Sequence, residues 1–136
     1  MPELEKIKEL FQNDRFATGI GCEIEAYDDG KSVIGITILP EHLNAAGTVQ
    51  GGVIATLADF AFAVAANGSG EWIVTLSSSM SYFKGVSDGR LTARARRITQ
   101  NHRTCYYDID VTEQTSVLVA KMVVTGYRCA KPLELR

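Results

Sequence analysis

The sequence predicts an α+β fold in which a curved antiparallel sheet wraps around one long central helix. The first observation behind this prediction is an apolar stretch at residues 53–66, whose side chains would surround a helix on all sides. A helix without a polar face must be enclosed by other parts of the chain. The second observation is that residues 72–128 contain only strand patterns. That sheet is the only material available to enclose the helix.

The length and composition fit one globular domain, which we expect to span residues 1–136. Hydrophobic residues make up 46% and charged residues 22%, a balance typical of a soluble protein. The net charge of −2 gives no reason to expect a nucleic acid or an anionic membrane as a partner. The start of the chain has no basic segment followed by an apolar core, so we expect no secretory signal.

The 3 cysteines and 2 histidines argue against a disulfide framework and against a metal site. The cysteines are odd in number, far apart and without a CxxC spacing, which favours a reducing, cytoplasmic location. The histidines leave a structural zinc site short of ligands. We therefore expect no metal and no redox cofactor.

The first half of the chain predicts a helix, a hairpin and then the central helix. Pro2 at a first helical turn and an apolar stripe predict an amphipathic helix at residues 2–11, within a segment that ends at residue 14. A turn signal at residues 28–30 separates two strand candidates, and Pro40 ends the second. The predicted order is strand 18–27, strand 32–39, loop 41–50, and a helix from Gly51-Gly52 to about Asn67-Gly68.

The second half predicts four strands in a meander, at residues 72–84, 90–100, 103–112 and 117–128. Apolar residues alternate clearly in the last two, which indicates one dry face and one wet face. The predicted strand 72–84 carries a row of small hydroxyl side chains, interpreted as lying on one side of the strand: Thr75, Ser77, Ser79 and Ser81. This row is either a partly wet sheet face or a surface for a second copy. A long edge strand needs covering, which favours a homodimer.

The junction between the loop and the central helix carries residues suited to chemistry. Asn44 lies in the loop, Gly51-Gly52 begins the helix, and Leu57-Ala58-Asp59 follows about two turns later. Free backbone N–H groups at a helix N-terminus stabilise developing negative charge, and glycine allows close approach. Burial raises the pKa of an aspartate, which makes its carboxylate a better base near neutral pH.

This pattern resembles the signature of hotdog-fold thioesterases of the phenylacetic-acid-degradation type. In that family an Asn in a loop precedes His-Gly-Gly at the start of the central helix, and Leu-Ala-Asp follows. The spacing from Asn44 through Gly51 to Asp59 matches without insertion. The resemblance implies a hotdog fold and hydrolysis of an acyl-CoA to free acid and coenzyme A, which is then part of the substrate and no cofactor. It also implies a homodimer or a dimer of dimers with sites at the subunit interface.

The resemblance implies a role for each site residue. Asp59 would be the general base for water or a nucleophile, and the Gly51 N–H would polarise the thioester carbonyl. Asn44 would hold the water or the carboxylate. Thr75 would correspond to a hydroxyl that reaches the site from the neighbouring subunit. Gln50 stands where the family has His; it exchanges hydrogen bonds but cannot titrate, so we expect it to be a helper.

Structural roles are open for the same residues. Asp59 could cap a backbone group or pair with an arginine, Gly51 could belong to a tight helix entry, and Asn44 could stabilise a turn. His42 is expected to be a surface or turn residue rather than a catalytic one. Several basic residues could bind the phosphates of coenzyme A but are more simply solvated strand charges: Lys84, Arg94, Arg96, Arg97 and Arg103.

Two other classes of function are open. A non-catalytic hotdog module could bind acyl-CoA as a sensor or carrier, and the replacement of the family His by Gln50 favours it. A hotdog hydratase acting on enoyl or 3-hydroxyacyl thioesters needs a His paired with an acid, for which His42 has the wrong context. The acyl pocket is expected to be apolar, with Phe60, Phe62 or the first helix as walls. No motif in the sequence identifies the acyl group.

Overall fold

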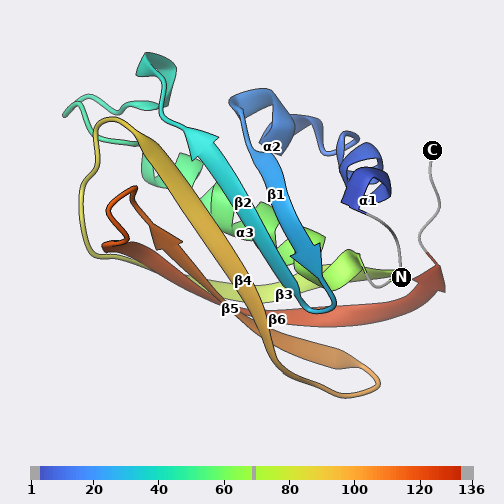
Figure 1. The fold of residues 1–136 in the computed structure, drawn as a ribbon. Helices are drawn as coiled ribbons and strands as arrows, with labels where there is room; N and C mark the ends of the chain where they lie inside the picture. Colours follow the sequence, from blue (N-terminus) through green and yellow to red (C-terminus); the bar gives the residue numbers. More distant parts are fainter. Residues whose placement is uncertain (1–3, 69, 133–136) are drawn as a thin grey trace.

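A computed structural model describes residues 4–68 and 70–132 as one six-stranded antiparallel sheet wrapped around a central helix (Figure 1). The strands follow the order β1-β2-β4-β5-β6-β3 across the sheet. The predicted fold class is confirmed. The elements are α1 (Leu4–Phe11), α2 (Arg15–Ile20), β1 (Glu23–Asp28), β2 (Lys31–Thr37), a 3₁₀ turn (Pro40–His42), α3 (Gly51–Asn67), β3 (Glu71–Tyr82), β4 (Arg90–Gln100), β5 (Thr104–Thr112) and β6 (Leu118–Pro132).

Helix α3 lies against the sheet (Figure 1), and most of its C-terminal half is buried. Leu57, Phe60 and Val64 are almost completely enclosed, as the apolar pattern predicts. Gly52 and Asp59, in contrast, are exposed. The expectation that no side of this helix meets water is therefore wrong for one flank of its N-terminal half. The reason is that this flank borders an open cleft rather than packed protein.

Polar groups fix both ends of α3. Gln50 is its N-cap residue, with φ −57° and ψ 132°. At the other end, buried Asn67 accepts a hydrogen bond through Oδ1 from the Ile73 N–H at 2.6 Å, which ties the helix to the start of β3. The predicted beginning at Gly51 and end at Asn67 are both confirmed.

The sheet topology differs from the predicted meander. Strands β4, β5 and β6 are consecutive neighbours, but β3 pairs with β6 at the far edge and β4 pairs with β2. Helix α3 connects β2 to β3, and β3 begins at the opposite edge of the sheet from β1. One long edge of β3 is therefore left without a partner strand in the described chain.

The segment before β1 also differs from the prediction. Residues 18–20 were expected in a strand but belong to helix α2. Asp14 caps this helix by accepting a hydrogen bond from the Ala17 N–H at 3.2 Å, and Gly21 ends it with φ 111°. The N-terminal helix is confirmed as α1, although Pro2 lies outside the described residues. Its Phe11 ring packs edge-on against Phe60, with centroids 5.9 Å apart.

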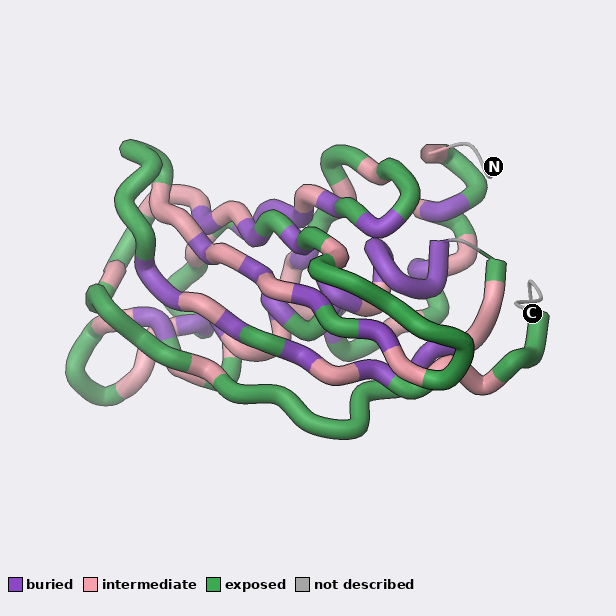
Figure 2. The backbone as a smooth tube through the Cα atoms, turned by 90° about the horizontal axis from the view of Figure 1, so that it is seen from below, coloured by how far each residue is buried: buried purple, intermediate pink, exposed green. Residues whose placement is uncertain are grey.

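Burial alternates along the inner strands, as the sequence predicts (Figure 2). In β5 the side chains that point to α3 are buried, namely Cys105, Tyr107, Ile109 and Val111. The sheet therefore has one face against the helix and one facing away. Within residues 4–68 and 70–132, no helix has the length and apolar character needed to span a membrane.

Candidate active site

An open cleft of about 440 Å³ runs along the uncovered flank of α3. Its walls come from α2, α3, β3 and β6. Asp59 lies in the wall, so its side chain does not point into packed protein. The lining residues are Asp14, Phe16, Ala17, Ala55, Thr56, Asp59, Phe60, Ser78, Met80 and Met122.

The cleft changes the acidity of Asp59. Desolvation by the surrounding protein raises the pKa of Asp59 above its ordinary value of 3.8, and the charge of Asp14 raises it further. A hydrogen-bonding interaction with the Thr75 side chain opposes the shift. The predicted direction is confirmed, although Asp59 is exposed to the cleft and not buried. Neighbouring protein atoms displace part of the water around a carboxyl even where the cleft is open.

A β-bulge brings Thr75 to Asp59. Thr75 pairs with Gly126, and the register then shifts before Ser77, which pairs with Thr125. A Cβ added to Gly126 would meet Phe62 and Cys105 side-chain atoms, so this position faces the core. Thr75 therefore lies on the helix side of β3, whereas the following serines at 77 and 79 line a hollow on the outer face with Val123.

The predicted single row of hydroxyls is therefore wrong, because an extra residue in a bulge reverses the alternation. The same bulge explains why the Thr75 side chain reaches Asp59 of its own chain. The resemblance to the thioesterase family implied a contact from a neighbouring subunit instead.

The side chain of Gln50 accepts a hydrogen bond from the N–H group that is predicted to bind the thioester oxygen. The Gly51 N–H donates to Gln50 Oε1 at 3.0 Å. The Gly51 carbonyl oxygen accepts a hydrogen bond from the Tyr82 hydroxyl at 3.2 Å. A substrate carbonyl would have to displace the Gln50 side chain to reach this donor.

Gly51 and Asp59 of one chain are too far apart to act on the same carbonyl group. Asp59 follows Gly51 by eight residues in α3, which corresponds to about 12 Å along the helix axis. Gly51 is also absent from the lining of the cleft that holds Asp59. The two predicted site residues are correctly placed on the helix, but the single chain does not bring them together.

Asn44 holds its own loop in the described chain. Its Oδ1 accepts hydrogen bonds from the Ala46 N–H at 2.9 Å and the Thr48 N–H at 3.1 Å. Its Nδ2 donates to the Thr48 hydroxyl at 3.1 Å. These contacts match the turn-stabilising reading, and none of them reaches Asp59.

His42 is a structural residue, as expected, but it is buried rather than on the surface. Its Nδ1 accepts from the Leu39 N–H at 2.9 Å, and Nε2 lies 2.7 Å from the Ile20 carbonyl oxygen. This network requires the tautomer in which Nε2 carries the proton. Both ring nitrogens are therefore engaged with backbone groups.

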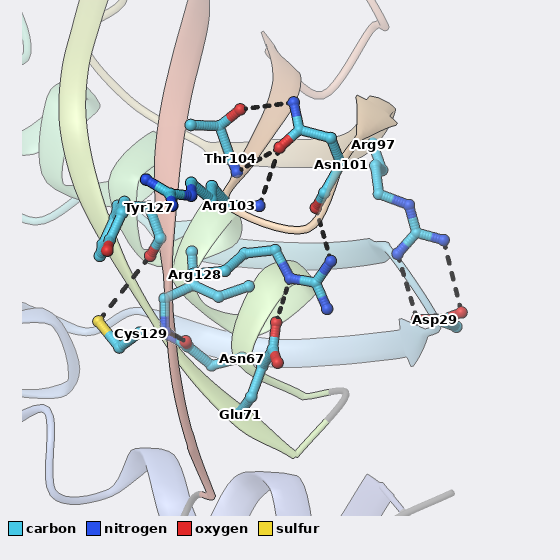
Figure 3. Close-up of polar contacts among 11 residues, drawn as sticks. Asp29, Asn67, Glu71, Arg97, Asn101, Arg103, Thr104, Tyr127, Arg128 and Cys129 are labelled. Carbon is cyan, nitrogen blue, oxygen red and sulfur yellow. Dashed lines mark hydrogen bonds and ion pairs between the residues drawn. The ribbon is translucent and has the colours of Figure 1, made fainter.

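Most of the candidate basic residues have protein partners. Arg96 donates to Asp108 at 2.9 Å. Figure 3 shows Arg97 beside Asp29, which it contacts at 3.3 Å. Arg94 donates to the Thr112 hydroxyl at 3.2 Å, and Lys84 lies 3.8 Å from Glu113. Arg103 is anchored through its backbone N–H by Asn101 Oδ1 at 2.9 Å (Figure 3). These contacts fit strand charges, so a site for coenzyme A phosphates stays a prediction.

One of the two phenylalanines predicted as walls of an acyl pocket lines this cleft. Phe60 lines the cleft, but Phe62 packs into the core against Tyr107, with ring centroids 5.3 Å apart. The wall expected from the first helix comes instead from α2, through Phe16, which is 71% exposed. In the described part of the chain, no three side chains of His, Cys, Asp or Glu gather to hold a metal ion.

Sequence reasoning missed Asp14 and Phe16 because it did not predict α2. A signal was present: an Asp at an N-cap position and a Gly just after the last helical residue bracket a short helix. The alternating apolar residues that follow predict a strand that begins at residue 18. The position of α2 over the cleft depends on tertiary packing and has no local signal.

The fold and the cleft define a hotdog-type protein with a carboxyl of raised pKa beside its central helix. Residues 46–120 match the thioesterase superfamily. A putative esterase of Archaeoglobus fulgidus is 31% identical over 127 residues, which cover 92% of this chain and 82% of that protein. The acyl-coenzyme A thioesterase PaaI of Escherichia coli is 32% identical over 112 residues, which cover 82% of this chain and 80% of that protein.

Solved structures agree with these matches. The Escherichia coli PaaI protein superposes with a TM-score of 0.88 at 29% identity, covering 91% of each chain. A hypothetical thioesterase of Streptococcus pneumoniae with coenzyme A gives a TM-score of 0.84 at 28% identity, covering 90% of this chain and 99% of that one. Structures of two variants of that thioesterase also match, one with an aspartate and one with a threonine replaced by alanine, sixteen positions apart.

This chain therefore belongs to the thioesterase superfamily. The similarity to PaaI in sequence and structure confirms the family that the Asn44–Asp59 pattern indicates.

Proposed function

We propose that this protein hydrolyses an acyl-CoA thioester to free acid and coenzyme A, with Asp59 activating the attacking water. The observation that carries the proposal is a carboxyl with a raised pKa on the wall of an open cleft. Groups with perturbed pKa values in clefts are typical of catalytic sites. Membership of the thioesterase superfamily and the acyl-CoA thioesterase among its relatives support the same reaction.

The chemistry follows from these groups. Asp59 takes a proton from water as the water oxygen attacks the thioester carbonyl carbon. A backbone N–H stabilises the negative oxygen of the tetrahedral intermediate. The intermediate then expels coenzyme A as a thiolate, which recovers the proton from Asp59. Thr75 orients the carboxylate through its hydroxyl. The aspartate and threonine replaced in the Streptococcus pneumoniae thioesterase have the same separation as Asp59 and Thr75, which supports this pairing.

We further propose that each site is shared by two copies of the chain. Gly51 is the predicted oxyanion donor, but it lies about 12 Å along the helix from Asp59 of its own chain. A second copy would supply its Gly51 N–H to the cleft of the first. Strand β3 offers an unpaired edge with exposed Val74 and Leu76, which suits pairing with its twin. We expect a homodimer or a dimer of dimers.

Gln50 acts as a helper in this scheme. Its side-chain oxygen holds the Gly51 N–H until the substrate carbonyl takes its place. The released Gln50 amide can then donate to the substrate, although it cannot transfer protons near neutral pH. Asn44 shapes the loop before the helix and so positions the Gly51 N–H.

One alternative function has an observation in its favour. A non-catalytic acyl-CoA-binding module needs no free oxyanion donor, and the Gly51 N–H is engaged by Gln50. A hydratase has less support, because both ring nitrogens of His42 are bonded to backbone groups.

The first experiment measures free thiol released from a panel of aromatic and aliphatic acyl-CoA substrates by the wild type and by Asp59→Asn. We expect hydrolysis of at least one substrate and a loss of at least about 10²-fold in the variant, the scale of a removed general base. Asp28→Asn is the matched control, because it makes the same change on the distant β1–β2 hairpin and should keep full activity.

The outcomes separate the three functions. Wild-type rates in Asp59→Asn would overturn the role of Asp59. Binding of coenzyme A without thiol release would select the binding module. Turnover of an enoyl thioester without loss of coenzyme A would select the hydratase.

A further inference from the structure

A second carboxylate shares the cleft with Asp59. Asp14 lines the same cavity from the start of α2. Among the lining residues that the structure describes, Asp14 and Asp59 are the only ionisable groups. The hydroxyl of Ser78 and the side chains of Met80 and Met122 complete the walls from β3 and β6. No cation in the described cleft wall balances the two carboxylates.

Asp14 is held in place by its role as a helix cap. Its Oδ1 accepts a hydrogen bond from the Ala17 N–H at 3.2 Å, and its carbonyl oxygen accepts one from the Thr18 hydroxyl at 2.8 Å. Asp14 is thus tied to α2 through both its side chain and its backbone. Its charge therefore has a fixed position on the cleft wall, because α2 packs beside α3.

We propose that Asp14 is a positioning residue whose fixed negative charge sets the pH range in which Asp59 works as a base. This inference rests on the proposed function of Asp59. It adds a residue outside the Asn44–Asp59 pattern, and it gives the short helix α2 a role in catalysis beyond forming a wall.

The physical basis is repulsion between like charges in a partly desolvated space. A negative charge near a carboxyl disfavours its ionised form and raises its pKa. Desolvation is the larger cause of the raised pKa of Asp59, the charge of Asp14 is the second, and Thr75 acts in the opposite direction. Arg15 follows Asp14 in the sequence but does not line the cleft, so it does not stand between the two carboxylates.

The chain allows the charge to be removed without removing the cap. Asparagine and serine are about as effective as aspartate at an N-cap position. Asp14→Asn therefore keeps a hydrogen-bond acceptor for the Ala17 N–H and removes only the negative charge. Asp14→Ser is a second neutral cap, used if the asparagine variant folds poorly. Asp28→Asn is the control for a change in net charge, since it lies on the opposite end of β1 from α2.

The test compares kcat/KM as a function of pH for wild type, Asp14→Asn and Asp28→Asn on one hydrolysed acyl-CoA. Loss of the Asp14 charge lowers the pKa of Asp59, so the acid limb of the profile should move to lower pH. We expect a shift on the order of half a pH unit, or about threefold more activity on the acid side. Added salt should shift the wild-type limb in the same direction and the Asp14→Asn limb much less.

A direct titration keeps this inference separate from the proposed function. The pH dependence of the Asp59 carboxyl ¹³C resonance, assigned with Asp59→Asn, reports its pKa without any substrate. A lower pKa in Asp14→Asn than in wild type supports the inference even where no acyl-CoA is hydrolysed. Identical Asp59 titration curves in wild type, Asp14→Asn and Asp14→Ser, with all three folded, would overturn it.

Discussion

At the scale of a single residue, Asp59 is the proposed catalytic base and also a group whose charge destabilises the folded protein. Its pKa is raised from 3.8, mainly by desolvation. A carboxyl whose pKa is higher in the folded protein binds its proton more tightly there than in the unfolded chain. Its ionisation at neutral pH therefore opposes folding. A carboxyl with a raised pKa on the wall of a cleft is typical of a functional site, which supports the proposed role of Asp59.

Asp59→Asn should therefore raise the melting temperature at neutral pH. The amide has nearly the same shape, keeps a hydrogen-bond partner for Thr75 and carries no charge to desolvate. The advantage should shrink as the pH falls through the raised pKa towards 3.8, because the wild-type carboxyl is then protonated in the folded state. Thermal unfolding of both proteins across this pH range checks the prediction. A wild type that is more stable than the variant at neutral pH contradicts it.

Sequence patterns identify some site residues and miss others for physical reasons. Asp59 and Gly51 are identifiable because a carboxyl in an apolar helix and a glycine at a helix start are local features. The sequence identifies Thr75 as a candidate site residue. It does not show which side of the strand the following serines face, because a bulge after Thr75 reverses the alternation. Asp14 is not identifiable as a cleft residue, because its position depends on how α2 packs against α3.

At the scale of secondary-structure elements, the N-terminus of α3 carries the N–H group that the proposed mechanism would release to the substrate. Gln50 has φ −57° and ψ 132°, an extended conformation, and Gly51 is the first helical residue. The hydrogen bond from the Gly51 N–H to the Gln50 side chain is exchangeable, since a substrate carbonyl oxygen can accept the same bond. This junction is therefore suited to alternate between a capped state and a substrate-bound state.

Gly51→Pro should remove this function while keeping the helix. Proline fits the first helical position, and the residue before it must be extended, as Gln50 already is. A Cβ at Gly51 would lie 3.6 Å from the Tyr82 ring, which is ordinary contact. We expect kcat to fall by about 10²–10³-fold, because the substitution removes the oxyanion donor. Gly51→Ala keeps the N–H and should retain far more activity than Gly51→Pro. Equal thiol-release rates in both variants would exclude this N–H as the donor.

The elements themselves are predicted unevenly. The boundaries of α3 follow from Gly51 and Asn67, which are strong local signals. Helix α2 was missed because its last residue, Ile20, also begins an alternating apolar pattern that continues into β1, and the choice is made by the cap at Asp14 and by packing. The place of β3 beside β6 was missed because pairing between distant strands leaves no pattern in either strand alone.

At the scale of the whole molecule, β3 is the feature that points to assembly. It is 12 residues long, lies at the sheet edge and carries exposed Val74 and Leu76. An open apolar edge of this length promotes pairing with another strand. Pairing of two β3 strands would also bring a second copy close to the cleft, since Ser78 and Met80 of the same strand form part of its wall.

Leu76→Lys should therefore weaken the assembly and lower activity together. A charge at the centre of the β3 edge opposes a close strand-to-strand contact. Val117→Lys is the matched control, because it places the same charge at another exposed apolar residue, just before β6. Light scattering and thiol release on the same samples check the prediction. An unchanged mass and rate in Leu76→Lys would show that this edge is not the interface.

Whether two copies share each site is decided by the activity of a mixed dimer made from one Asp59→Asn chain and one Gly51→Pro chain. If each site takes Asp59 from one copy and Gly51 from the other, this dimer has one site with both defects and one intact site. We expect each parent homodimer to be at least about 10²-fold impaired and the mixed dimer to recover about half of the wild-type rate per dimer. A mixed dimer as inactive as its parents would contradict the shared site.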